Sequence, residues 1–244
     1  MFVTASLPMY DWPEIRFSTD AFWAGLAHRA GLTGELDRRR PYDLLWRDPA
    51  MMFSQTCGYP FTHEFKGMLH YLATPHYAVH GCEGANYSSH IFAREALPLT
   101  HYRNAKPAVN SLDSMSGMLA LKLVFANHAI AVANPLITGS HVASLTAVQS
   151  GQADVCAIDA VVVALARRHR PQLLQGLHEI ARSPLVPGLP FVTRSGDVIR
   201  LRDALRKAFS DPALAKAREA MLLTGFSILP VGAYDIILQL EAKL

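Results

Sequence analysis

The sequence predicts a folded α/β protein, and three observations support this class. Short apolar runs alternate with longer amphipathic segments along the whole chain. Half of the 244 residues are hydrophobic and 18% are charged, which is typical of a globular chain with a sufficient core. Polar clusters follow several of the apolar runs, where ligands of α/β sheets bind. Strands that alternate with helices also predict a mainly parallel sheet.

The first half of the chain is expected to begin with a strand and a helix. The apolar run 2–9 predicts the strand, and the segment from Ser18 or Thr19 to Ala30 predicts a helix that Gly31 ends. Further strands are expected within 46–56, within 68–79 with a break at Pro75, and at 89–94 and 106–110.

Two polar loops rich in small residues precede apolar helices in the second half. The loop 111–117 leads into a helix at 118–128, and the loop 138–141 leads into a helix at 141–150 with Gly151 as its C-cap. The remaining elements are expected to be strands at 153–158, 173–181 and 191–194, a rigid crossover at 184–190, and helices at 161–169, 201–209, 213–223 and 231–244.

The charge balance excludes some functions. A net charge of +3 is too mild for a dedicated nucleic-acid protein and favours a small anionic ligand. The basic runs Arg38–Arg40 and Arg167–Arg170 are expected to be solvated helix ends. No apolar stretch reaches membrane-spanning length, so no membrane insertion is expected. The opening residues lack an export signal, which predicts a mature or cytoplasmic chain.

The three cysteines have no C-x-x-C spacing, so neither a zinc ribbon nor a redox pair is expected. Two alternatives remain: three reduced thiols, or a bridge between Cys57 and Cys82. His76 and His80 lie near Cys82, but no fourth ligand is apparent. No metal and no cofactor are therefore predicted.

Ser114, Ser116 and Gly117 lie directly before a predicted helix, where hydroxyls and free N–H groups favour an anion. Plain helix capping is the alternative. Ser140 and His141 repeat the arrangement, and a histidine in a first helical turn is held neutral and can donate to an oxyanion. The alternative for His141 is a surface imidazole with no functional role.

Other candidates follow the remaining strands. Tyr10 and Tyr59 are loop phenols that either cover a ligand or plug the core. Asp159 ends an apolar strand. Its carboxylate is expected either to accept a hydrogen bond from a ligand, to hold His141 in one tautomer, or to cap the next helix. The polar residues between the strand at 46–56 and Tyr59 complete the set of candidates, namely Ser54, Gln55 and Thr56.

The sequence lacks the common catalytic motifs. It contains no G-x-S-x-G elbow, no H-E-x-x-H, no Walker loop and no G-x-G-x-x-G. A nucleophile or nucleotide site of these types is therefore not predicted.

Five segments resemble the substrate-binding proteins of phosphate, phosphite and phosphonate ABC transporters. They are SQTCGYP at 54–60, GCEGANYSS at 81–89, SMSG at 114–117, TGSHVASLTAVQSGQADVCAID at 138–159 and PGLPFVT at 187–193. The resemblance implies a type 2 periplasmic-binding-protein fold, with two lobes joined by two hinge crossovers. It implies lobe 1 at 1–86 plus 185–244, lobe 2 at 87–184, and crossovers near 87–91 and 181–187.

The resemblance also implies roles. Ser114, Ser116, Gly117 and His141 would hold an oxyanion in a cleft between the lobes, and a tyrosine, Tyr59 or Tyr10, would cover it. The implied protein is a periplasmic, non-enzymatic solute-binding protein that presents its ligand to an ABC permease.

Two other functions remain open. One is a cytoplasmic enzyme on the same fold, in which His141 and Asp159 act as acid and base. The other is a sensor lobe that passes its ligand state to a protein partner through an exposed apolar patch.

Overall fold

The computed structural model describes residues 4–244, which form two compact units. Unit 1 comprises the chain up to Ala78 together with Pro187–Val231, and unit 2 comprises Val79–Val186 together with Gly232–Leu244. The predicted lobe boundaries differ from these, because 79–86, 185–186 and 232–244 belong to unit 2. In the first of these segments, β4 (Cys82–Glu83) pairs with β5 (Asn86–Tyr87).

Unit 1 is built on a five-stranded sheet in the order β1-β2-β12-β3-β13. Its strands are β1 (Thr4–Ala5), β2 (Met51–Gln55), β3 (His70–Tyr77), β12 (Phe191–Thr193) and β13 (Leu223–Ser227). Only β1 and β2 are parallel, whereas β12 is antiparallel to both β2 and β3, and β13 is antiparallel to β3. The prediction of a mainly parallel sheet is wrong for this unit, because β12 returns from the distant segment 187–231 between two earlier strands.

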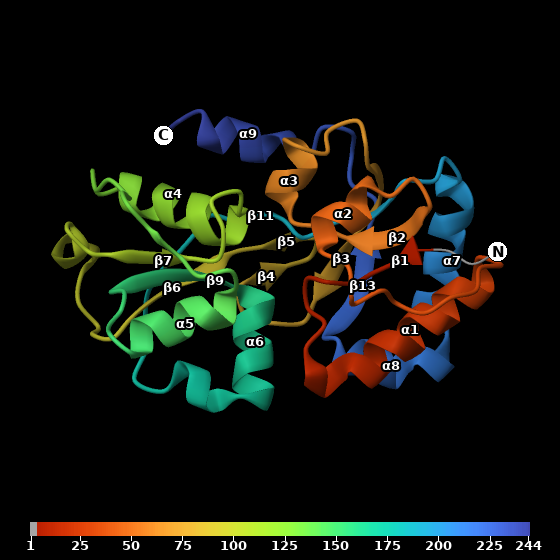
Figure 1. The fold of residues 1–244 in the computed structure, drawn as a ribbon, viewed down its shortest axis with the longest axis horizontal. Helices are drawn as coiled ribbons and strands as arrows, with labels where there is room; N and C mark the ends of the chain where they lie inside the picture. The colour runs from red at the N-terminus through yellow and green to blue at the C-terminus, as the bar shows by residue number, and fades with distance from the viewer. Residues whose placement is uncertain (1–3) are drawn as a thin grey trace. The chain divides into compact units, whose positions relative to one another are not determined.

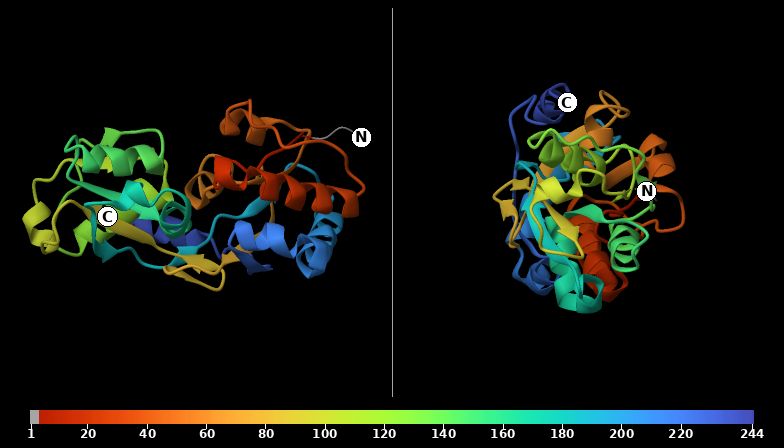
Figure 2. Two further views of the ribbon diagram at one scale, coloured as in Figure 1. Left: turned by 90° about the horizontal axis from the view of Figure 1, so that it is seen from below. Right: turned by 90° about the vertical axis from the view of Figure 1, so that its left-hand side faces the viewer.

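Helices cover this sheet and bury its aromatic core. They are α1 (Arg16–Arg29), α2 (Tyr42–Arg47), α3 (Gly58–Thr62), α7 (Val198–Ser210) and α8 (Ala215–Ala220). Helix α1 packs against α7 and α8, as Figure 2 shows. Trp23 of α1 stacks on Phe53 of β2 with ring centroids 5.8 Å apart, and the Phe53 ring contacts that of Phe191 at 5.1 Å.

Three predictions for unit 1 need correction. Trp46 belongs to α2, and the strand starts only at Met51. Strand β3 continues through Pro75 without the expected break. The expected helix 213–223 ends at Ala220, because Leu222 adopts a left-handed backbone conformation (φ 61°) and β13 follows at once. The helix expected from Ser18 or Thr19 to Ala30 is confirmed as α1, although it starts at Arg16. Residues 2 and 3 of the first expected strand lie outside the described residues.

Unit 2 is built on a second sheet in the order β10-β6-β9-β7-β8. Its strands are β6 (Ser89–Ala93), β7 (Pro107–Val109), β8 (Leu136–Ile137), β9 (Val155–Asp159) and β10 (His178–Arg182). Strand β7 is parallel to β8 and β9, whereas β6 is antiparallel to β9 and β10. A three-stranded sheet joins β4 and β5 to β11 (Val186–Pro187).

The second sheet carries helices on both faces. In Figure 1, α4 (Ala120–Ala126) lies on one face, and α5 (His141–Gln149) and α6 (Ala160–His169) lie on the other. The predicted α5 and α6 are confirmed, and Gly151 takes the expected left-handed conformation (φ 77°) after α5. The strand expected at 173–181 begins only at His178, as β10, because a 3-10 turn occupies Pro171–Leu174. The last helix, α9, is shortened to Asp235–Glu241.

All three cysteines are free thiols in the structure. Burial raises the pKa of the Cys82 thiol to about 12, and the nearby Asp159 carboxylate acts in the same direction. Burial also raises the pKa of Cys156. Both thiols are therefore protonated at neutral pH and are poor nucleophiles. None of the described helices is both long and apolar enough to cross a membrane.

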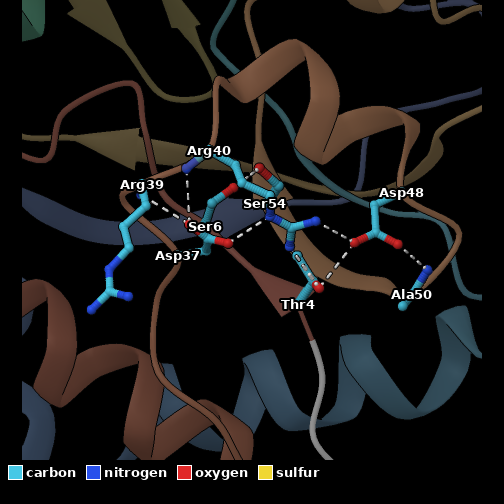
Figure 3. A network of polar contacts seen from close by, with 8 residues as sticks. All are labelled: Thr4, Ser6, Asp37, Arg39, Arg40, Asp48, Ala50 and Ser54. Carbon is cyan, nitrogen blue, oxygen red and sulfur yellow. Dashed lines mark hydrogen bonds and ion pairs between the residues drawn. The ribbon is translucent and has the colours of Figure 1, made fainter.

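One of the two basic runs does not end a helix. Arg38–Arg40 lies in the loop between α1 and α2, where Arg40 joins the carboxylates of Asp37 (2.7 Å) and Asp48 (2.8 Å). The Arg40 guanidinium also reaches Thr4 of β1 at 3.0 Å (Figure 3). This network ties the loop to the edge of the unit 1 sheet, and hydrogen bonds from Arg40 lower the pKa of both carboxyls.

We expect Arg40→Gln to lower the free energy of unfolding at pH 7 by about 1 kcal/mol, because this partly exposed network loses its central cation. The difference from the wild type should be fully present above pH 3.8 and should shrink as pH falls through the pKa values of the two folded carboxyls, which lie below 3.8. Arg39→Gln is the matched control: only its backbone N–H contacts Asp37, and its side chain points away in Figure 3. Urea denaturation of the three proteins at pH 7 and pH 3 measures both effects, and equal losses in the two variants would contradict the account.

Candidate functional site

Two helix starts of unit 2 lie side by side at the end of β7. After β8, the N–H of Thr138 donates to the carbonyl of Val109 at 2.9 Å, and the N–H of Gly139 donates to the carbonyl of Asn110 at 3.0 Å. Gly139 takes a left-handed conformation (φ 84°) that turns the chain into α5. The start of α5 is thereby fastened to the strand that leads into the first polar loop.

The first helix begins with a π-helical turn, Met115–Leu119, that continues into α4. The Ser114 hydroxyl oxygen caps it by accepting the N–H of Gly117 at 2.9 Å. Such turns are wider than an α-helix and are frequent at functional sites, and the first turn of a helix leaves N–H groups without intrahelical acceptors. The predicted start at Met118 is therefore too late, because the turn already includes Met115 and Ser116.

Ser116 and His141 bring the two helix starts together. The Ser116 hydroxyl and His141 Nε2 share a hydrogen bond of 2.8 Å. Nδ1 of the same ring is buried without a hydrogen-bond partner. Burial lowers the pKa of His141 to about 4, while the Ala157 backbone opposes the shift. The imidazole is therefore neutral at pH 7. The sequence predicts this state from the helix dipole, whereas burial is its cause in the structure.

Asn110 also lies at the first helix start, beside Gly117. The pattern of polar residues in the sequence does not identify it as a candidate. Its Oδ1 is buried without a partner. A Cβ atom added at Gly117 would come within 2.0 Å of it, so glycine lets the Asn110 side chain lie this close to the turn. The signal available in the sequence was its position: Asn110 ends the strand that precedes the serine loop.

The structure assigns two other candidates to helix capping. The Ser140 hydroxyl accepts the N–H of Ala143 at 3.1 Å at the start of α5. Asp159 is buried at the start of α6, and its Oδ1 accepts the N–H of Val161 at 2.7 Å. Nε2 of His141, the partner expected for Asp159, shares its hydrogen bond with Ser116.

In unit 1, Gln55 and Tyr10 belong to one polar group with Tyr77. The Gln55 amide donates to the Tyr77 hydroxyl and to the carbonyl of Leu189, both at 3.0 Å. The rings of Tyr10 and Tyr77 meet edge to face, with centroids 5.3 Å apart. These side chains line a small hollow within unit 1.

The other three candidates of unit 1 are separate from this group. Ser54 is fully buried and bonds to Ser6 (2.9 Å) and to the Trp46 indole (3.1 Å), so it serves the core. Thr56 is also fully buried, and its N–H donates to the carbonyl of Pro190 at 3.2 Å. Tyr59 lies in the first turn of α3 and stacks on His63 with ring centroids 3.8 Å apart.

The two α/β units and the paired helix starts define a binding protein of the two-lobed periplasmic type. A sequence profile of the family described as the periplasmic substrate-binding protein of ABC phosphonate transporters matches residues 51–229. The chain belongs to this family of periplasmic substrate-binding proteins. A search of curated protein sequences finds no match.

Solved structures of low sequence identity share the fold of this chain. PhnD1 from Prochlorococcus marinus, in complex with methylphosphonate, has a TM-score of 0.78 at 14% identity, covering 99% of this chain and 97% of that one. A binding protein component of an ABC phosphonate transporter from Pseudomonas aeruginosa also has a TM-score of 0.78, at 17% identity, covering 98% and 85%. A Xanthomonas citri protein bound to ATP has a TM-score of 0.73 at 20% identity, covering 99% and 96%.

We expect Gly117→Ala to cost about 1–3 kcal/mol of stability, because the new methyl group overlaps Asn110 Oδ1 and displaces this side chain from its place beside the serine loop. Gly196→Ala is the matched control, since nothing lies within 4 Å of its added Cβ. Thermal unfolding of both variants measures the difference. Equal midpoints would show that the contact between Asn110 and Gly117 does not constrain the loop.

His141 should also make stability depend on pH. Its pKa falls from 6.5 in the unfolded chain to about 4 in the folded protein, so the unfolded state binds more protons between these values. Stability is therefore lost as pH falls through this window, by about 2 kcal/mol at pH 5. Between pH 7 and pH 5, we expect the free energy of unfolding of His141→Gln to fall by about 2 kcal/mol less than that of the wild type. Urea titrations at the two pH values measure this difference. Equal losses of unfolding free energy in the two proteins would contradict a His141 imidazole that is neutral in the folded protein.

Proposed function

We propose that the chain captures a phosphonate-class oxyanion at the Ser116–His141 pair and delivers it to an ABC permease. The hydrogen bond of 2.8 Å between Ser116 and His141 carries this proposal. It brings two polar groups from separate helix starts to one point, and neither group is needed to cap its helix.

The chemistry of this pair suits an oxyanion. An anion at this point accepts the Ser116 O–H and an imidazole N–H, and so replaces one neutral hydrogen bond by two charge-assisted ones. The positive ends of two helix dipoles favour the same negative charge. Because the imidazole is neutral, the site attracts its ligand through aligned donors and needs no proton uptake by His141 near pH 7.

The phosphonate class is supported by the family and by the ligand of the Prochlorococcus neighbour, methylphosphonate. A tetrahedral headgroup offers three oxygens, enough for the hydroxyl, the imidazole and a backbone N–H of the π-helical turn. The contributions of Tyr10 and Tyr59 to ligand binding stay predictions, which Tyr→Phe and Tyr→Ala variants test.

Isothermal titration with methylphosphonate tests the site. We expect Ser116→Ala and His141→Asn each to weaken binding 10- to 100-fold, because each removes one charge-assisted hydrogen bond worth about 1.5–3 kcal/mol. Phosphate, phosphite and methanesulfonate in the same series rank the headgroups.

Thr146→Ala is the matched control, because this exposed residue of α5 bonds only to the carbonyl of Val142 in its own helix. Its affinity should equal that of the wild type. Wild-type affinity in the Ser116→Ala, His141→Asn double variant would refute the site. No binding of any tested oxyanion by the wild type would refute the ligand class.

A further inference from the structure

A group of potential metal ligands lies in unit 2 outside the helix-start site. His80, His90 and Glu179 come from the segment before β4, from β6 and from β10, and one ligand atom of each lies within 4.8 Å of the others. His90 is completely buried, whereas Glu179 retains 27% of its side-chain exposure and His80 is exposed. The group is therefore a buried imidazole with an opening to solvent.

The hydrogen bonds of His90 are unusual because both ring nitrogens face acceptors. Nε2 lies 3.2 Å from the carbonyl oxygen of His80, and Nδ1 lies 2.7 Å from Glu179 Oε2. A neutral imidazole has one N–H and can serve only one of these acceptors. When Nδ1 carries the proton, it donates to Glu179 Oε2. When the proton is on Nε2, Nδ1 and Oε2 direct lone pairs at the same point, where a metal cation can replace the shared proton.

The backbone around the ring is shaped to hold this orientation. Gly81 has a left-handed conformation (φ 97°), and an added Cβ would lie 2.7 Å from His90 Nε2. The N–H of Ser88 donates to the carbonyl of Gly81 at 2.7 Å and closes the loop. A histidine whose second nitrogen donates to a backbone carbonyl has the arrangement usual for metal ligands.

Arg182 covers the group on its open side. Its guanidinium lies 3.2 and 3.3 Å from the two ring nitrogens of His80 and donates to Glu179 Oε1 at 2.6 Å. The two carboxylate oxygens thus have different partners: Oε1 pairs with Arg182, and Oε2 faces His90. A cation bound at Oε2 requires Arg182 to leave the His80 ring but not Glu179.

We propose that His80, His90 and Glu179 bind a divalent transition-metal ion of the zinc type. Two imidazoles and one carboxylate are a known zinc donor set, with a water in the fourth position. Ligands at zinc distances lie about 3.3 Å apart in a tetrahedral site, so the contact of 2.7 Å has to open by about half an ångström. Because the Arg182 guanidinium lies beside the His80 ring, an ion has to compete with it for the imidazole.

Titration of the metal-free 244-residue chain tests this site, with Zn²⁺ by calorimetry and with Co²⁺ by absorption. We expect one Zn²⁺ per chain and a tetrahedral Co²⁺ spectrum. His80→Ala and Glu179→Gln should each weaken Zn²⁺ binding at least tenfold. Arg182→Gln should strengthen it several-fold, because the competing cation is removed.

His128→Ala is the matched control, because His128 is an exposed histidine of the same unit and lies outside the group. It should bind Zn²⁺ like the wild type. Three results would overturn the proposal: no binding by the wild type, unchanged binding by both His80→Ala and Glu179→Gln, or a thiolate-to-cobalt charge-transfer band that assigns the metal to a cysteine. Methylphosphonate binding by His80→Ala, expected at wild-type affinity, separates a failure of this site from a failure of the oxyanion site.

Discussion

The candidate site depends on one hydrogen bond, between Ser116 and His141, because it joins two helix starts that are 25 residues apart in the sequence. The backbone bonds from Thr138 and Gly139 to the end of β7 hold those starts in place before any ligand arrives. Donors positioned in this way lose little entropy on binding, which is the general advantage of a preorganised site. The rest of unit 2, with helices on both faces of its sheet, supports this local arrangement.

Similar side chains at these helix starts have different tasks. Ser114, Ser140 and Asp159 accept backbone N–H groups and thereby stabilise the helices that position the site. Ser116 and His141 lie next to two of these caps and bond to each other instead. The structure therefore separates residues that cap a helix from neighbouring residues that do not, and the proposed ligand contacts belong to the second group.

The sequence predicts the elements that local patterns determine. Apolar runs locate β6 and β9, and the Ser-His start with Gly151 at the end locates α5. Strand direction and unit boundaries were not predictable in this way, because they depend on pairing between distant segments, such as β12 with β2. The π-helical turn and the contact of Asn110 with Gly117 were also missed, since both arise from packing that no spacing of residue types reveals.

The account's central claim is that Ser116 and His141 hold the ligand headgroup together. A crystal structure of the protein with methylphosphonate tests this most directly. The account predicts phosphonate oxygens within hydrogen-bond distance of both the Ser116 hydroxyl and an imidazole nitrogen of His141, with their mutual hydrogen bond broken. A bound phosphonate elsewhere, with the contact between Ser116 and His141 intact, would contradict it.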